Sequence, residues 1–181
     1  MSARRLSALW ARWRADTRGV AAVEFAMVLP ILMVIYLVGF ETSQAVAAYR
    51  KLTDTTVQLG NVTTQYTTMS ALDVNNVLNA SAQIMSPDST TNLTIVLSEV
   101  TTDVNGNATV TWSKTFQGTA LAVGSAVTPP TGSRTPNTNY ILVQTTYTYV
   151  PTVGANVIGN FPMNDQIWML PRQSPAIPYT G

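Results

Sequence analysis

Glu24 is a carboxylate in a place where charge is costly. It is the single charged residue between Val20 and Phe40, a run of 21 residues that is otherwise almost entirely apolar. A carboxylate within a membrane helix is unfavourable by a few kcal/mol at the centre and by less near an end. Gly19 precedes it by five residues, and a glycine neither favours helix nor obstructs an approaching protease. This spacing indicates a substrate for another protein's chemistry rather than a catalyst.

The residues before this motif are basic. Residues 1–19 carry five arginines and one aspartate, a net charge of +4, whereas residues 20–181 carry a net charge of −3. Positive charge ahead of an apolar segment holds that end of the chain in the cytoplasm. As a helix, residues 20–40 would span about 30 Å, the thickness of a bilayer core. Ala45-Val46-Ala47 resembles a signal-peptidase site only faintly, and the apolar run is longer than the core of a secretory signal.

No other group of residues indicates catalysis or metal binding. The chain has no Cys and no His, which removes thiol chemistry, disulfides, imidazole acid–base work and Cys/His zinc sites. Asp103-Val-Asn105-Gly-Asn107 resembles a calcium loop, but the glutamate expected further on is missing and a hairpin turn explains the pattern. We expect no enzyme activity, cofactor or metal unless folding brings distant carboxylates together. A basic patch within a folded domain is also missing, so we expect no nucleic-acid partner.

Two helices are predicted after the leader. The first continues past the membrane to a C-cap at Gly60-Asn61, and the second begins at Ser70, which has capping-box spacing to Asp73, and runs to about Met85. Their inward residues are predicted from helical spacing; they are Ala45, Tyr49, Leu52, Thr56 and Leu59 on the first and Leu72, Val77, Leu78, Ala82 and Met85 on the second.

The rest of the chain predicts strands. The whole chain has 27 threonines, and threonine with Val, Ile and Tyr gives the C-terminal two-thirds a strand-rich composition. The expected strands are 93–100, 108–116, 140–150 and 166–170, with a hairpin turn at Asn105-Gly106-Asn107 and an unpaired proline-rich tail. The predicted fold class is α+β: a long N-terminal helix and a short helix packed on an antiparallel sheet of about four strands. The predicted divisions are a leader at 1–19, the long helix at 20–60 and a domain at 61–181.

The motif Gly19, Glu24, Phe25, followed by Leu29-Pro30 in the apolar run, resembles a known family. It is similar to the TadE/TadG-like pilus assembly proteins, which are minor pilins of tight-adherence (Flp, type IVc) pili. Tyr49-Arg50-Lys51-Leu52 and Met169-Leu170-Pro171-Arg172 also resemble a TadE-like subgroup. The resemblance covers residues 18–55 best, and the later sequence less well.

This resemblance implies cleavage between Gly19 and Val20 by a membrane-embedded prepilin peptidase. Cleavage would create an ammonium at Val20, one helical turn from Glu24, which could neutralise it or that of a neighbouring subunit. Glu24 and Phe25 are then a processing and assembly motif. The competing interpretation is an interfacial glutamate favoured by the helix dipole. Pro30 removes a helical hydrogen bond, which predicts a kink, although proline is also simply tolerated in membrane helices.

The resulting hypothesis is a structural minor pilin that supports assembly of a Tad pilus used in surface adhesion. Its expected partners are a prepilin peptidase, other pilin subunits, assembly platform proteins and the inner membrane, with the C-terminal domain in the periplasm or, after assembly, in an extracellular pilus. Two alternatives remain: an uncleaved, membrane-anchored periplasmic binding domain, and a pseudopilin of a secretion system.

Overall fold

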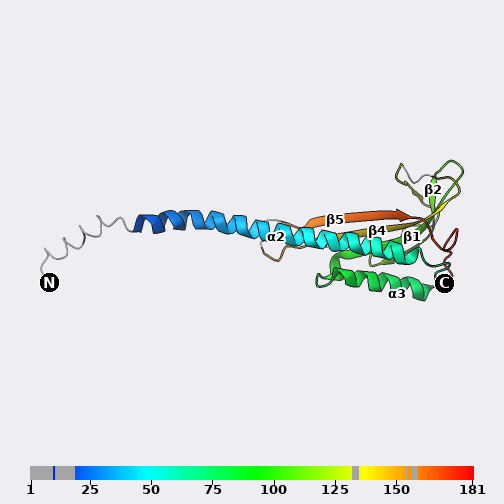
Figure 1. Ribbon diagram of the computed structural model, residues 1–181, viewed down its shortest axis with the longest axis horizontal. Coiled ribbons are helices and arrows are strands. Elements are labelled where there is room, and N and C mark those ends of the chain that lie inside the picture. The colour runs from blue at the N-terminus through cyan, green and yellow to red at the C-terminus, as the bar shows by residue number, and fades with distance from the viewer. Residues whose placement is uncertain (1–9, 11–18, 132–134, 154, 156–158) are drawn as a thin grey trace. The chain divides into compact units, whose positions relative to one another are not determined.

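The structure, a computed structural model, describes Trp10 and residues 19–131, 135–153, 155 and 159–181 (Figure 1). The predicted leader, apart from Trp10 and Gly19, lies outside the described residues. The chain divides into two compact units, Met1–Ser43 and Gln44–Gly181. Helix α2, Val20–Thr63, begins in the first unit and supplies its last turns to the second.

Helix α2 is longer than the predicted first helix. The predicted C-cap at Gly60 is wrong, because Gly60 lies within the helix and is buried against β5. A Cβ on Gly60 would lie 2.8 Å from the Met169 sulfur, so the glycine allows close packing rather than ending the helix. The predicted inward face is also wrong at one position: Tyr49 is exposed, and the neighbouring Ala48 is buried instead.

Helix α3, Ala71–Ala82, begins as predicted. Ser70 and Asp73 form a complete capping box, with each side chain bonded to the other's backbone N–H. A 3₁₀ turn, η2, Gln83–Met85, completes the helical segment. The inward face includes Val74 in place of Leu72, which is exposed and whose predicted burial is wrong.

The sheet has five strands in the order β3-β2-β1-β4-β5, each antiparallel to its neighbours. The strands are β1, Leu93–Thr102; β2, Ala108–Phe116; β3, Ala126–Val127; β4, Asn139–Tyr149; and β5, Phe161–Met169. A 3₁₀ turn, η3, Thr90–Asn92, precedes β1. The α+β class is confirmed, but the last strand begins at Phe161 rather than Gln166, and β3 lies between β2 and β4, where no strand was predicted. β5 is an edge strand in which no residue is fully buried. Its first half therefore lacks the regular apolar alternation from which a strand is predicted.

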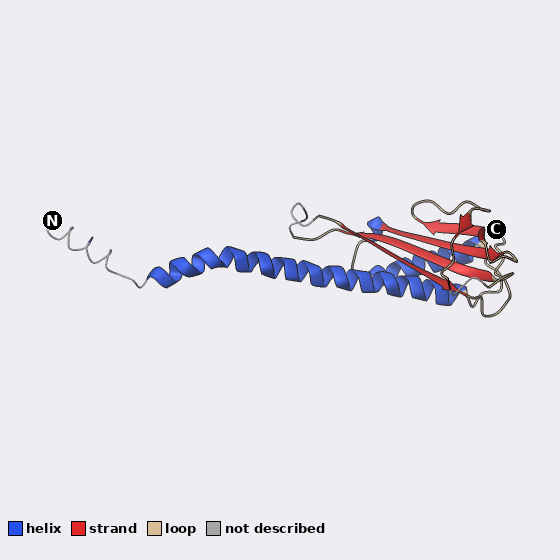
Figure 2. Ribbon diagram, turned by 90° about the horizontal axis from the view of Figure 1, so that it is seen from above, coloured by secondary structure: helices blue, strands red, loops and turns tan. Residues whose placement is uncertain are grey.

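One face of the sheet carries the last turns of α2 and all of α3 (Figures 1 and 2). Thr56 on α2 bonds Thr145 on β4 at 2.6 Å. The two helices and this face bury the main core, which includes Leu52, Leu59, Leu97 and Val143. A smaller cluster on the other face lies beneath the connection that contains β3.

The proline-rich tail was predicted to be unpaired, and this is wrong for its last residues. Tyr179 forms a parallel bridge with Met69, and Ile177 is fully buried in the main core. The tail therefore packs against the segment that precedes α3.

Candidate functional site

The motif residues lie at the start of α2. Gly19 is exposed, and among the described residues beyond its chain neighbours no atom lies within 4 Å of a Cβ built on it. Val20 is the first residue of the helix, and Glu24 and Phe25 follow in its first two turns, all of them exposed. The structure thus places Glu24 one turn after Val20 on the same helix face. A carboxylate there could pair with an ammonium at Val20 or be presented to another molecule.

The helix that carries this motif exposes an apolar surface in which Glu24 is the one charged residue between Val20 and Phe40. Its most apolar window has a mean hydropathy of 2.4, and none of that window is buried within the chain. Among residues 20–40 every side chain is exposed apart from Leu37, which is partly covered. Burial in water-free surroundings is what such a surface favours. The helix is long and apolar enough to cross a membrane.

Pro30 lies inside α2, and the helix continues through it. The proline therefore does not end the helix. A kink at this position stays a prediction, as do the roles of Gly19, Val20, Glu24 and Phe25 in processing.

Two carboxylates of the second unit, Asp73 and Asp103, are used in local structure. Asp103 accepts bonds from the backbone N–H groups of Asn105 and Asn107 at 2.8 Å each and from the Asn107 side chain at 2.9 Å. These bonds lower the pKa of Asp103, with the Asn107 side chain contributing most. The Ser70 side chain likewise lowers the pKa of Asp73. Asp103 thus organises the hairpin turn, and within the described residues no group of three acidic side chains could hold a metal ion.

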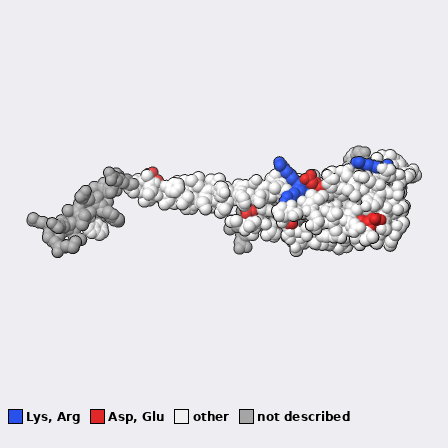
Figure 3. Space-filling view, turned by 60° about the horizontal axis from the view of Figure 1, so that its bottom comes forward, with Lys and Arg blue, Asp and Glu red and all other residues white. Residues whose placement is uncertain are grey.

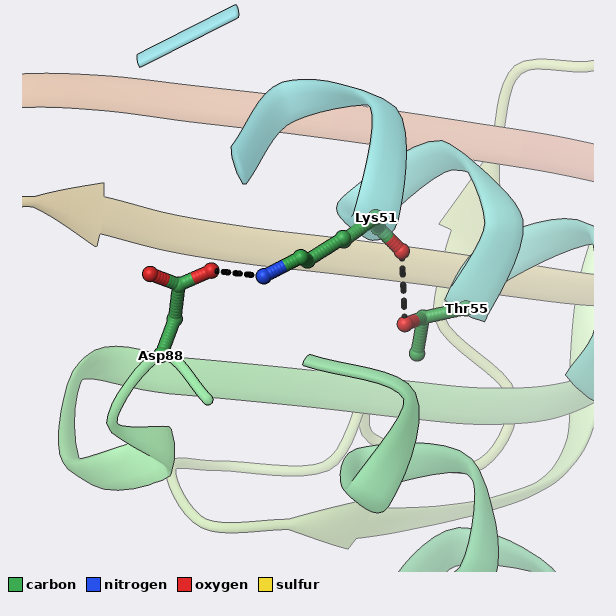
Figure 4. Close-up of polar contacts among 3 residues, drawn as sticks. All are labelled: Lys51, Thr55 and Asp88. Atoms are coloured by element: carbon green, nitrogen blue, oxygen red, sulfur yellow. Dashed lines mark hydrogen bonds and ion pairs between the residues drawn. The ribbon is translucent and has the colours of Figure 1, made fainter. Parts of the chain in front are cut away.

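An ion pair fixes α2 to the segment after η2. Lys51 on α2 contacts Asp88 at 2.7 Å, and both side chains are partly buried (Figure 4). The Thr55 hydroxyl donates to the Lys51 carbonyl at 2.8 Å, one turn along the same helix. Helical spacing predicted the helix on which Lys51 lies, but a partner 37 residues away could not be read from that spacing.

Glu99 is a buried carboxylate that the sequence analysis did not single out. It is 1 % exposed on β1, and it accepts a bond from the backbone N–H of Ile177 at 2.6 Å. The Trp112 indole N–H donates to the carbonyl of the same Ile177 at 2.8 Å. Burial raises the pKa of Glu99, opposed by these donors. Because Glu99 and Trp112 together bond both polar groups of one tail residue, they fasten the tail to the sheet.

A comparison with known protein families gives a match to the N-terminal part of the chain. Residues 19–58 match the model of a family described as TadE-like protein. The chain carries a TadE-like segment. Neither the curated proteins nor the solved structures include a significant match.

The TadE-like segment coincides with the elements that carry the predicted site. It begins at Gly19 and ends within α2, so it contains Glu24, Phe25, Pro30 and the Tyr49-Arg50-Lys51-Leu52 sequence. The predicted resemblance is confirmed over these residues. The sheet and α3 lie outside the match.

Proposed function

We propose that this chain is a structural minor pilin that supports assembly of a Tad pilus in surface adhesion. The observation that carries the proposal is the coincidence of three boundaries: the TadE-like match begins at Gly19, α2 begins at Val20, and the apolar surface begins with it. A peptidase that cuts after Gly19 would release the helix at its first residue. The TadE-like family indicates a protein associated with a Tad pilus, and the subunit role is the finer step proposed here.

The chemistry of the first turn supports processing. Among the described residues, and apart from Gly19's direct chain neighbours, no atom lies within 4 Å of a Cβ built at Gly19 where a prepilin peptidase would approach. The product would carry an ammonium at Val20 and a carboxylate at Glu24, groups that stabilise one another in apolar surroundings. Other pilin subunits and assembly platform proteins are then the partners of the apolar helix, and the chain itself performs no catalysis.

Membrane placement follows from the charge pattern. The leader, with a net charge of +4, would stay in the cytoplasm while α2 crosses the inner membrane and the second unit lies in the periplasm. Assembly would carry that unit into an extracellular pilus.

N-terminal sequencing of the full chain, extracted from membranes of piliated cells, tests the proposal. A chain that starts at Val20, together with its recovery in purified pili, supports a processed subunit. A chain that still carries residues 1–19 in mature pili or membranes contradicts processing and favours an uncleaved anchored domain.

A further inference from the structure

β5 presents a long open edge. It is the last strand in the sheet, and among the described residues no strand pairs with its outer side. At the other end of the sheet, the edge of β2 is partly covered by β3 and by Val110, whose N–H and C=O bond Ser125 and Gly124. An open edge offers backbone N–H and C=O groups to a strand of another chain. The outer edge of β5 is therefore the place where a strand of a second copy could add.

Electrostatic repulsion gives the second unit little protection from its own copies. Residues 44–181 contain five Lys or Arg and six Asp or Glu, a net charge of −1. On the face drawn in Figure 3, the charged side chains form a few separate groups and most of the surface is uncharged. A net charge near zero favours association. An open edge on such a unit therefore needs local features that prevent strand pairing.

The hydrogen bonds of β5 show which of its backbone groups face outward. In an antiparallel pair the N–H and C=O of one residue point to the same side, and the side alternates along the strand. The Gln166 N–H donates to the Asp165 carboxylate at 2.9 Å, which indicates that it faces away from β4. The Asp165 carbonyl accepts a bond from the Thr145 hydroxyl on β4 at 3.5 Å, so it faces inward. Pro162 belongs to the same outward set as Gln166, as expected for a proline in an edge strand.

The outward set offers no two successive donors to an added strand. It consists of Pro162, Asn164, Gln166 and Trp168. Pro162 has no N–H, and the Gln166 N–H is already bonded to Asp165. The other two donors of the set are four residues apart, about 14 Å, whereas successive donors of a regular edge are two residues apart, about 7 Å. A carbonyl of the added strand would lose water between them without gaining a partner, which is unfavourable.

Asp165 also places a charge beside this edge. By alternation its side chain belongs to the face that carries the helices, together with Met163 and Ile167, which pack against the main core. Its side chain is partly buried. An added strand would bring a carbonyl oxygen toward this carboxylate, and neither group has a proton to donate. Prolines and inward-pointing charged residues are recurrent means of protecting strand edges in natural sheets.

We propose that Pro162 and Asp165 close the outer edge of β5 to strand addition by a second copy, so that copies of the chain associate through other surfaces. Asp165 contributes most, because it both occupies a donor and places a charge at the edge. This protection acts within the second unit, whether or not the leader is removed and whichever way α2 crosses a membrane.

Cysteine cross-linking of the full chain in detergent tests the proposal, since the natural chain has no cysteine. Gln166→Cys on β5 is the reporter, and a short bismaleimide links two copies whose β5 edges meet. Thr109→Cys, an exposed position on β2, reports association through another part of the sheet. Asp165→Thr frees the donor and removes the charge, and Pro162→Thr restores a missing donor. Asn164→Thr, which introduces the same residue on the same strand, is the matched control.

We expect Asp165→Thr to raise the cross-linked dimer at position 166 severalfold over the natural residue, and the double variant with Pro162→Thr to raise it further. Asn164→Thr should stay at the background level, and the yield at position 109 should not change. Tryptophan fluorescence shows whether each variant has folded. Folded Asp165→Thr and double variants that cross-link no more than the natural chain overturn the proposal.

Two further outcomes are decisive. Strong cross-linking at position 166 with Pro162 and Asp165 both present would mean that the edge is open, and the proposal would be wrong. If Asp165→Thr does not fold, Pro162→Thr decides in the same assay, because it creates two successive outward donors with Asn164. A higher dimer yield from that variant supports the proposal, and an unchanged yield overturns it.

Discussion

Gly19 and Gly39 are two glycines with the same local freedom and different expected roles. Each is exposed, and among the described residues a Cβ built on either would meet no atom within 4 Å beyond the adjoining chain. Gly19→Val should block processing, because a branched side chain restricts the backbone and obstructs peptidase access. Gly39→Val makes the same chemical change farther along α2 and should leave processing intact. Immunoblots that resolve the two chain lengths measure this difference, and equal mature bands from both variants would count against cleavage at Gly19.

Glu24 is expected to matter after cleavage rather than before it. Glu24→Ala should be processed nearly as well as the natural chain, and its insertion should improve because an intramembrane charge is gone. Its pili should be strongly reduced, since the ammonium at Val20 would be left unpaired in apolar surroundings at a cost of several kcal/mol.

Pilus counts by electron microscopy, with processing followed in the same cells, measure the effect of Glu24→Ala. Glu24→Asp keeps the charge and is the matched control. Normal piliation of Glu24→Ala would show that the carboxylate is only a residue favoured at the start of a helix.

Glu99 should make stability depend on pH. Because burial raises its folded-state pKa from an ordinary value of 4.5, its contribution to folding is fully present below that value. The contribution is lost as pH rises from 4.5 through the raised pKa, by about 1.4 kcal/mol for each pH unit that separates the folded-state pKa from the unfolded-state pKa.

Glu99→Gln keeps an acceptor for the Ile177 N–H and removes this titration. Denaturant unfolding of the full chain in detergent, followed by tryptophan fluorescence from about pH 4 to about pH 8, should show a decline for the natural chain that the variant lacks. Parallel curves for the two chains would contradict the sign or the assignment.

Residues whose contacts are with near neighbours in the sequence were easier to predict than residues whose contacts are with distant parts of the chain. The capping box needs only Ser70 and Asp73 three residues apart, so the sequence predicts it and the structure confirms it. Glu99 has no local signal, because its role depends on a tail residue 78 positions later. Leu72 was wrongly predicted to be buried. Its helical spacing agreed with an inward position, but Val74 is the buried residue of this turn of α3.

At the scale of elements, Gly60 shows how packing overrides propensity. A glycine near the end of a helical pattern predicts a C-cap, yet here α2 continues to Thr63 because the glycine admits Met169 from β5. β5 was predicted only in part for a related reason. No residue of this edge strand is fully buried, so burial imposes little alternation of apolar and polar residues on it, and its first half needed the register with β4 to be found.

Gly60→Val should therefore loosen the contact between α2 and β5. The added atoms would overlap the Met169 side chain, and overpacking of this kind typically costs about 1–3 kcal/mol. Met169→Ala in the same chain should recover part of the loss, because it vacates the space that the introduced valine side chain would need. A double-mutant cycle on the free energy of unfolding measures the coupling, and purely additive effects would mean that Met169 is not the obstructing group.

At the scale of the whole molecule, the asymmetry of charge predicts orientation. The five arginines of the leader all precede the apolar run. The second unit, which contains the sheet, the buried core and the tail bonded to the sheet, follows that run. The predicted side of the membrane for that unit follows from the leader alone, since positive residues beside a membrane segment resist translocation.

A reporter that is active only in the periplasm should therefore be active when fused after Gly181. Replacing the leader arginines Arg4, Arg5, Arg12, Arg14 and Arg18 by glutamine should reduce that activity, because the charge that holds the N-terminus inside is then lost. The same five substitutions by lysine keep the charge and should preserve the orientation, which separates charge from arginine-specific contacts. A cytoplasm-only reporter fused at the same position should stay silent in the natural chain. If that reporter is active instead, the second unit is cytoplasmic, and its incorporation into an extracellular pilus could not follow.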